Sequence, residues 1–98
     1  MTGGLSKKQW RQILEVITRH PNIHAIVLYG SRAMGNFANG SDIDLALKGD
    51  NITSKQLTRI GLDYENLYLP WKLDLTLYED ITNVQLREHI NRIGKALK

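Results

Sequence analysis

A glycine-rich loop that leads into an alternating strand decides the fold of this chain. Residues 30–47 read GSRAMGNFANGSDIDLAL. From Asp42 to Leu47 every second residue is isoleucine or leucine, and this period of two is typical of a β-strand. Side chains two positions apart share a face, so Asp42 and Asp44 point to the side opposite the apolar residues. Aspartate is a poor strand former, and two of them in such a strand indicate a function.

A second alternating segment, Lys72 to Tyr78, carries another aspartate. Its leucines must face the core, so Asp74 faces away from the core. If the two strands are neighbours with their apolar faces aligned, Asp42, Asp44 and Asp74 converge on one face. Two carboxylates about 7 Å apart repel by roughly 2 kcal/mol at an effective dielectric constant near 20, so such a cluster needs a cation. Oxygen ligands alone favour Mg²⁺ or Mn²⁺, whereas the alternative is three ordinary solvated aspartates.

The pair Gly30-Ser31 follows the apolar segment Ile23–Tyr29, which predicts a strand buried on both faces. Backbone N–H groups at such a turn are unpaired and can bind an anion. Glycine permits close approach of a phosphate, Ser31 adds a hydroxyl donor, and Arg32 is the nearest cation. The alternative is a plain turn that ends the strand.

The rest of the chain predicts three helices. They cover residues 6–19, capped by Ser6, the segment between Thr53 and Pro70, and the segment from a cap at Thr82 to a stop at Gly94. The element order predicts an α/β fold in which a small mixed sheet of three or more strands is flanked by helices. We expect the aspartates on one face of this sheet and helices covering the other. The length of 98 residues predicts a single domain over 1–98.

Composition narrows the classes of function. The 13 basic and 10 acidic residues give a net charge of +3, but the basic residues are scattered, so nucleic-acid binding is not expected. The longest fully apolar stretch, Ala25–Tyr29, is too short to span a bilayer, and no basic start leads into an apolar segment, so a secreted role is not expected. Together with the lack of cysteine, this predicts a cytoplasmic protein without a membrane role.

The spacing of the two motifs resembles a known signature. Gly30-Ser31, followed after ten residues by Asp42-Ile43-Asp44, is similar to the motif of the polymerase-β-like nucleotidyltransferases, in particular the minimal nucleotidyltransferases (MNT). The resemblance implies that fold, a metal site of Asp42, Asp44 and Asp74, and a Gly30-Ser31 turn that holds the phosphates of ATP or another nucleoside triphosphate. Met34 departs from the pattern, because many members have a second basic residue there, and this leaves Arg32 as the nearby cation.

The resemblance also implies a function and a partner. MNT proteins are commonly encoded beside small helical HEPN proteins as antitoxin and toxin, so we expect transfer of a nucleoside monophosphate, in particular AMP, to a hydroxyl of such a partner. One alternative is an antitoxin that binds nucleotide but acts only by masking its partner. Another is an aminoglycoside-type small-molecule nucleotidyltransferase, although 98 residues leave little room for an acceptor-binding domain. A homo-oligomer is a further possibility.

The stretch from Tyr64 to Trp71 is rich in aromatic residues. Such residues often anchor interfaces, and Tyr68 and Leu69 fall outside the helical stripe of residues 60, 64 and 67. We therefore expect Tyr68 and Leu69 to contact the partner. The alternative is that this stretch closes the core beneath the strand of Asp74.

Overall fold

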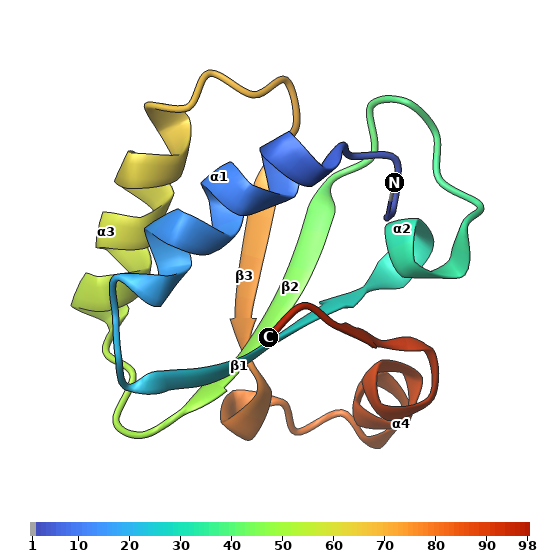
Figure 1. Cartoon of the computed structure of the whole chain (residues 1–98). Coiled ribbons are helices and arrows are strands. Elements are labelled where there is room, and N and C mark those ends of the chain that lie inside the picture. Colours follow the sequence, from blue (N-terminus) through green and yellow to red (C-terminus); the bar gives the residue numbers. More distant parts are fainter. Residues whose placement is uncertain (1) are drawn as a thin grey trace.

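The structure, a computed structural model, describes residues 2–98 and contains a four-stranded mixed sheet with helices on both of its faces (Figure 1). The elements, in chain order, are α1 (Lys7–Thr18), β1 (Ile23–Tyr29), α2 (Gly30–Met34), β2 (Ile43–Gly49), α3 (Ser54–Glu65), β3 (Leu73–Leu77), the 3-10 turn η1 (Tyr78–Asp80), α4 (Val84–Ile93) and β4 (Lys95–Ala96). Within the described range, no helix is long and apolar enough to cross a membrane.

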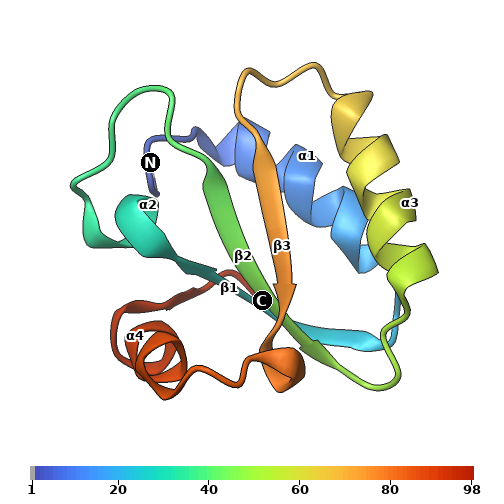
Figure 2. The same cartoon turned by 180° about the vertical axis from the view of Figure 1, so that it is seen from behind.

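The strand order is β3-β2-β1-β4 (Figure 2). The parallel pair β2 and β3 is central to the site, because its register sets Asp44 opposite Asp74. Strand β1 is antiparallel to β2 on one side and to the two-residue β4 on the other. The predicted mixed sheet is confirmed, and β4 was not expected from the sequence.

Helices α1 and α3 cover the face of the sheet that carries the isoleucines and leucines of β2. The fully buried side chains of this core include Ile13, Leu28, Ile43, Leu45 and Ile60. Because these residues come from two helices and two strands, they fix the face of the sheet on which each strand buries its apolar residues. The aspartates of β2 and β3 are thereby directed to the opposite face.

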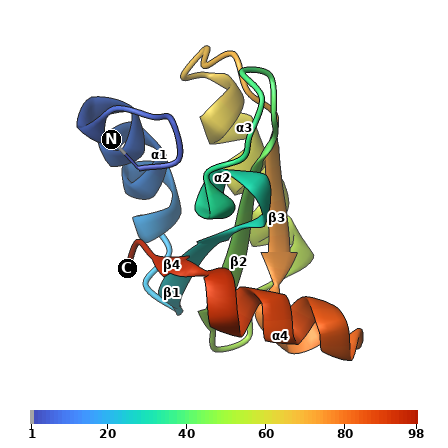
Figure 3. The ribbon, with the colours of Figure 1, turned by 90° about the vertical axis from the view of Figure 1, so that its right-hand side faces the viewer.

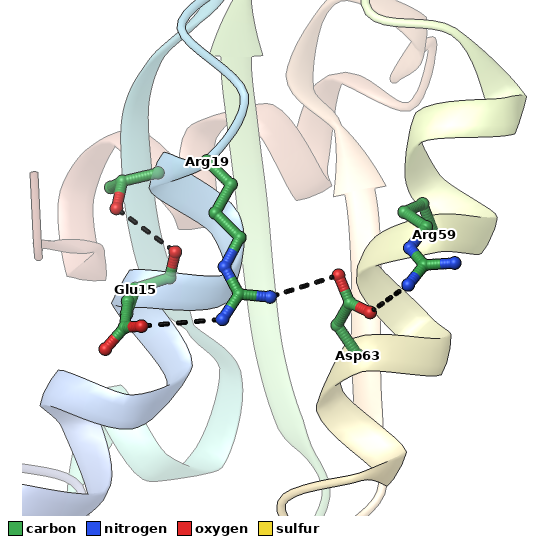
Figure 4. Close-up of polar contacts among 5 residues, drawn as sticks. Glu15, Arg19, Arg59 and Asp63 are labelled. Atoms are coloured by element: carbon green, nitrogen blue, oxygen red, sulfur yellow. Dashed lines mark hydrogen bonds and ion pairs between the residues drawn. The ribbon is translucent and has the colours of Figure 1, made fainter.

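An ionic link joins the two helices of this layer (Figure 4). The Arg19 guanidinium lies 3.4 Å from the Asp63 carboxylate and 3.4 Å from that of Glu15. Asp63 also accepts from Arg59 at 2.9 Å, and its side chain is only 10% exposed. The pairs are at the edge of the layer, so we assign them to the alignment of α1 with α3 rather than to the bulk of the stability.

The helix starts largely follow the predicted caps. Ser6 caps α1 in a reciprocal pair with Gln9, as expected. The predicted cap of the last helix, Thr82, is wrong by one residue, because the side chain of Asn83 accepts from the backbone N–H of Leu86 at 3.0 Å. Asparagine is the stronger N-cap of the two.

Helix α4 lies on the aspartate face of the sheet, opposite α1 (Figure 3). Its Ile90 is 2% exposed and packs in a second small cluster with Tyr29, Ala46 and Ile81. We expected helices to cover the face opposite the aspartates; α1 and α3 do so, whereas α4 covers the aspartate face itself. The apolar spacing of α4 predicts an amphipathic helix but carries no information on which face of the sheet it covers.

Candidate active site

The three aspartates lie at the start of the two parallel strands. Asp44 and Asp74 are register partners on β2 and β3, so their side chains share one face of the sheet. The Asp44 side chain is half-buried, whereas Asp74 is exposed. Asp42 is also exposed and precedes β2, which begins at Ile43 and not at Asp42 as expected.

The electrostatics of Asp44 identify it as the centre of this group. Burial raises the pKa of its carboxyl, and the negative charges of Asp74 and Asp42 raise it further. The positive charge of Arg32 acts in the opposite direction. The charges of Asp74 and Asp42 therefore lie close enough to oppose the ionisation of Asp44, which is the condition that a bound cation relieves.

The three aspartates have the donor type that a divalent cation needs, but their side chains are not arranged around one point. All three donors are carboxylates, the ligand type that Mg²⁺ and Mn²⁺ take. Nevertheless, residues 2–98 include no group of three histidine or acidic side chains already placed to hold a metal ion. Ligation by all three aspartates would require side-chain rotation of the exposed Asp42 and Asp74.

Gly30 sits directly beside the Asp44 carboxylate. It has a left-handed backbone, with φ of 74°, and a Cβ at this position would collide with Asp44 Oδ2. Glycine is thus required at position 30 for two reasons, its conformation and the room it leaves. The backbone N–H of Gly30 is not the free donor that we expected, because it donates to His89 Nε2 at 3.1 Å. Ser31, the second residue of α2, is half-buried.

Arg32 is engaged with the backbone. Its side chain is 2% exposed, and the guanidinium donates to the carbonyl of Gly3 at 2.7 Å and to that of Ser41 at 2.8 and 3.0 Å. The same group lies over the rings of Phe37 and Trp71. These contacts shape the loop between α2 and β2, so we remove Arg32 from the expected phosphate contacts. Its charge still reaches Asp44.

Two residues of the site were missed in the sequence. Tyr29 ends β1, and its hydroxyl reaches over β2 to hydrogen-bond with Thr76 Oγ1 at 3.1 Å. Burial raises the pKa of its phenol, and the charges of Asp44 and Asp74 add to this rise. His89 of α4 contacts the ring of Tyr29 edge-on, with 6.2 Å between centroids. Strand parity predicts the face of Tyr29, because Tyr29 pairs with Asp44, but the sequence gives no signal for His89.

Comparison with known proteins places this geometry in a family. The family described as "Polymerase beta, Nucleotidyltransferase" matches residues 11–98. The chain belongs to this family. It is a nucleotidyltransferase domain, and the resemblance of the two motifs is confirmed at that level. No curated protein matches the chain.

Solved structures share the nucleotidyltransferase fold. A chain in a toxin–antitoxin complex crystallised with AMP-PNP is 20% identical, with a TM-score of 0.75, over 91% of this chain and 72% of that chain. A chain in the complex of a tri-AMPylated HEPN toxin with its MNT antitoxin, from Shewanella oneidensis, is 18% identical, with a TM-score of 0.69, over 96% of this chain and 72% of that chain. A chain of an MntA–HepT toxin–antitoxin complex is 18% identical, with a TM-score of 0.69, over 95% of this chain and 72% of that chain.

Proposed function

We propose that this nucleotidyltransferase transfers AMP from ATP to a hydroxyl group of a co-encoded helical HEPN-type protein and so acts as its antitoxin. The observation that carries the proposal is the register of Asp44 with Asp74 beside the Gly30-Ser31 turn. Acidic groups and a glycine–serine turn at one place are the two parts that we assign to nucleotidyl transfer.

The reaction is a displacement at the α-phosphorus of ATP. The acceptor oxygen forms a bond to that phosphorus, the bond to the oxygen that bridges the α- and β-phosphates breaks, and pyrophosphate leaves. The acceptor proton passes to a base or to water. No covalent bond to the protein is needed, so positioning and charge neutralisation account for the catalysis.

The residues of this chain divide these tasks. Asp44 and Asp74, with Asp42 beside them, would hold Mg²⁺ or Mn²⁺, which lowers the pKa of an acceptor hydroxyl and neutralises the triphosphate. The hydroxyl and N–H of Ser31 are the proposed donors to the phosphates, while Gly30 provides the room. Asp74, as the exposed member of the register pair, is the proposed acceptor of the hydroxyl proton.

The proposed partner and nucleotide rest on two of the structural relatives. One was crystallised with AMP-PNP, and another contains a tri-AMPylated HEPN toxin bound to an MNT antitoxin. Both share the fold of this chain over more than nine-tenths of its length. If the chain were an antitoxin that only masks its partner, the neighbouring charges that raise the pKa of Asp44 would have no role.

A labelling experiment tests the proposal. The purified chain is incubated with Mg²⁺ and each α-labelled nucleoside triphosphate, with and without the co-encoded neighbour. We expect label from ATP on the neighbour, and we expect Asp44→Asn to abolish it. Stable association without label on the neighbour would support masking instead and would refute transfer.

Thermal stability provides a second readout. Millimolar Mg²⁺ with ATP should raise the melting temperature of the parent chain, because the folded state alone binds them. Asp44→Asn should show no such rise. A parental transfer rate in this variant would remove Asp44 from the proposed metal site.

A further inference from the structure

His89 makes a hydrogen bond that the proposed function does not explain. Its Nε2 accepts from the backbone N–H of Gly30 at 3.1 Å. A backbone amide can only donate, so this ring nitrogen carries a lone pair, and the proton of the neutral imidazole is on Nδ1. The ring therefore acts as an acceptor at the first residue of the Gly30-Ser31 turn.

The imidazole is itself held in place. It is half-buried and meets the ring of Tyr29 at an interplanar angle of 79°. The next residue, Ile90, is buried in the cluster between α4 and the sheet. The far end of α4 approaches β1 closely, because a Cβ at Gly94 would collide with Val27 Cγ1. His89 thus acts from a helix that is held against the sheet by the residues that follow His89.

The Gly30-Ser31 turn requires such a contact from outside. Gly30 has a φ of 74°, and glycine populates several other backbone regions with similar ease. A change of this backbone would move the Ser31 donors and would also change the gap that the Asp44 carboxylate occupies. An acceptor on a neighbouring helix that binds the Gly30 N–H selects one conformation.

We propose that His89 is a positioning residue for the nucleotide, which fixes the Gly30-Ser31 turn through the Gly30 N–H. This inference rests on the proposed function, because it assigns the turn to the phosphates. It also divides the turn in two: the N–H of Gly30 is committed to His89, and the phosphate contacts belong to Ser31.

A matched pair of variants tests the hydrogen bond. In His89→Gln the side-chain oxygen can occupy the position of Nε2, whereas the shorter side chain of His89→Asn reaches only the position of Nδ1. Both variants carry the same amide group, and thermal melting verifies that both are folded. We expect His89→Asn to raise the KM for ATP about three- to tenfold, the loss of one hydrogen bond, with kcat changed less than about twofold. His89→Gln should restore the parental KM.

The outcomes separate this inference from the proposed function. Equal KM values in the two variants would overturn the positioning role, even with full transfer by the parent chain. In the nucleotide-free protein, ¹⁵N NMR should show the Nδ1–H tautomer and a scalar coupling between Gly30 N and His89 Nε2, independently of any activity. Absence of that coupling would overturn the inference. A coupling in a chain that binds no ATP would refute both the nucleotide role of His89 and the proposed function.

Discussion

Gly30 and Asp44 approach each other so closely that no side chain fits at position 30 without displacing the carboxylate. Gly30 follows β1 and Asp44 lies on β2, and Asp44 pairs with the last residue of β1. The turn that we assign to the phosphates and the acidic group that we assign to the metal are therefore one packed unit.

We predict that Gly30→Ala abolishes transfer, with a fall of more than about 100-fold, since a displacement of about 1 Å at a reacting group costs that much. The free energy of unfolding should fall by about 2–4 kcal/mol through left-handed strain and the collision. Gly35→Ala is the matched control, because its φ is 86° but open space surrounds its Cβ. It should cost only about 1 kcal/mol in urea denaturation and leave transfer intact. Equal effects of the two substitutions would contradict the packing argument.

The raised pKa of Asp44 predicts an unusual pH dependence of stability. The folded state holds the Asp44 proton more tightly than the unfolded state does. This group therefore destabilises the fold as the pH rises from 3.8, the ordinary pKa of an aspartate, through the raised pKa of Asp44. In EDTA at neutral pH, Asp44→Asn should therefore be more stable than the parent, by about 0.5–1 kcal/mol. The difference should vanish below the ordinary pKa. Urea titrations at a series of pH values measure it, and a variant less stable at neutral pH would be the contrary result.

Burial of Arg32 predicts a large loss of stability on its removal. Arg32→Met retains the length of the side chain but leaves the carbonyls of Gly3 and Ser41 without their donor. We expect a loss of about 2–4 kcal/mol from unpaired buried groups, measured by urea denaturation. Arg92→Met, at an exposed position of α4, is the control and should change stability by less than about 0.5 kcal/mol. A small effect at Arg32 would mean that water replaces the guanidinium.

Tyr68 and Leu69, the two residues that we expected at the interface, differ in exposure, although both lie in the loop after α3. Tyr68 is 88% exposed and has a left-handed φ of 54°, whereas Leu69 is half-buried against the core. Tyr68 is therefore the more exposed of the two to a partner, and an exposed ring in a strained conformation adds little to the isolated fold. Tyr68→Asn should weaken association with the HEPN-type protein more than about tenfold, while the melting temperature stays the same or rises. Unchanged affinity in calorimetry would place the interface elsewhere.

Local signals predict the fold well where one element decides the outcome. The alternating apolar residues of β2 and β3 predict the face of the aspartates, because a shift by one residue would turn the apolar side chains away from the core. The register of the two strands is not predicted, because a shift by two residues keeps each side chain on its face. Ser6 with Gln9 fixes the start of α1 within a few residues.

Contacts between distant segments were not predictable. Arg32 is bonded to carbonyls nine and 29 residues away, and a carbonyl leaves no mark in a sequence. His89 meets the backbone N–H of Gly30 across 59 residues, and a backbone N–H likewise leaves no mark in a sequence. Strand β4 has only two residues, too few for any period. The family and the acidic face follow from residue patterns, whereas the roles of Arg32 and His89 follow only from the packed structure.

Strand β3 forms one end of the sheet and, within residues 2–98, has no strand on its outer side. Its unpaired backbone groups offer a template on which a strand of another molecule can add, the first step of edge-to-edge aggregation. The exposed charge of Asp74, near the start of this strand, disfavours such addition. The carboxylate proposed for chemistry thus also keeps copies of the chain apart, and loss of its charge would cost solubility as well as transfer.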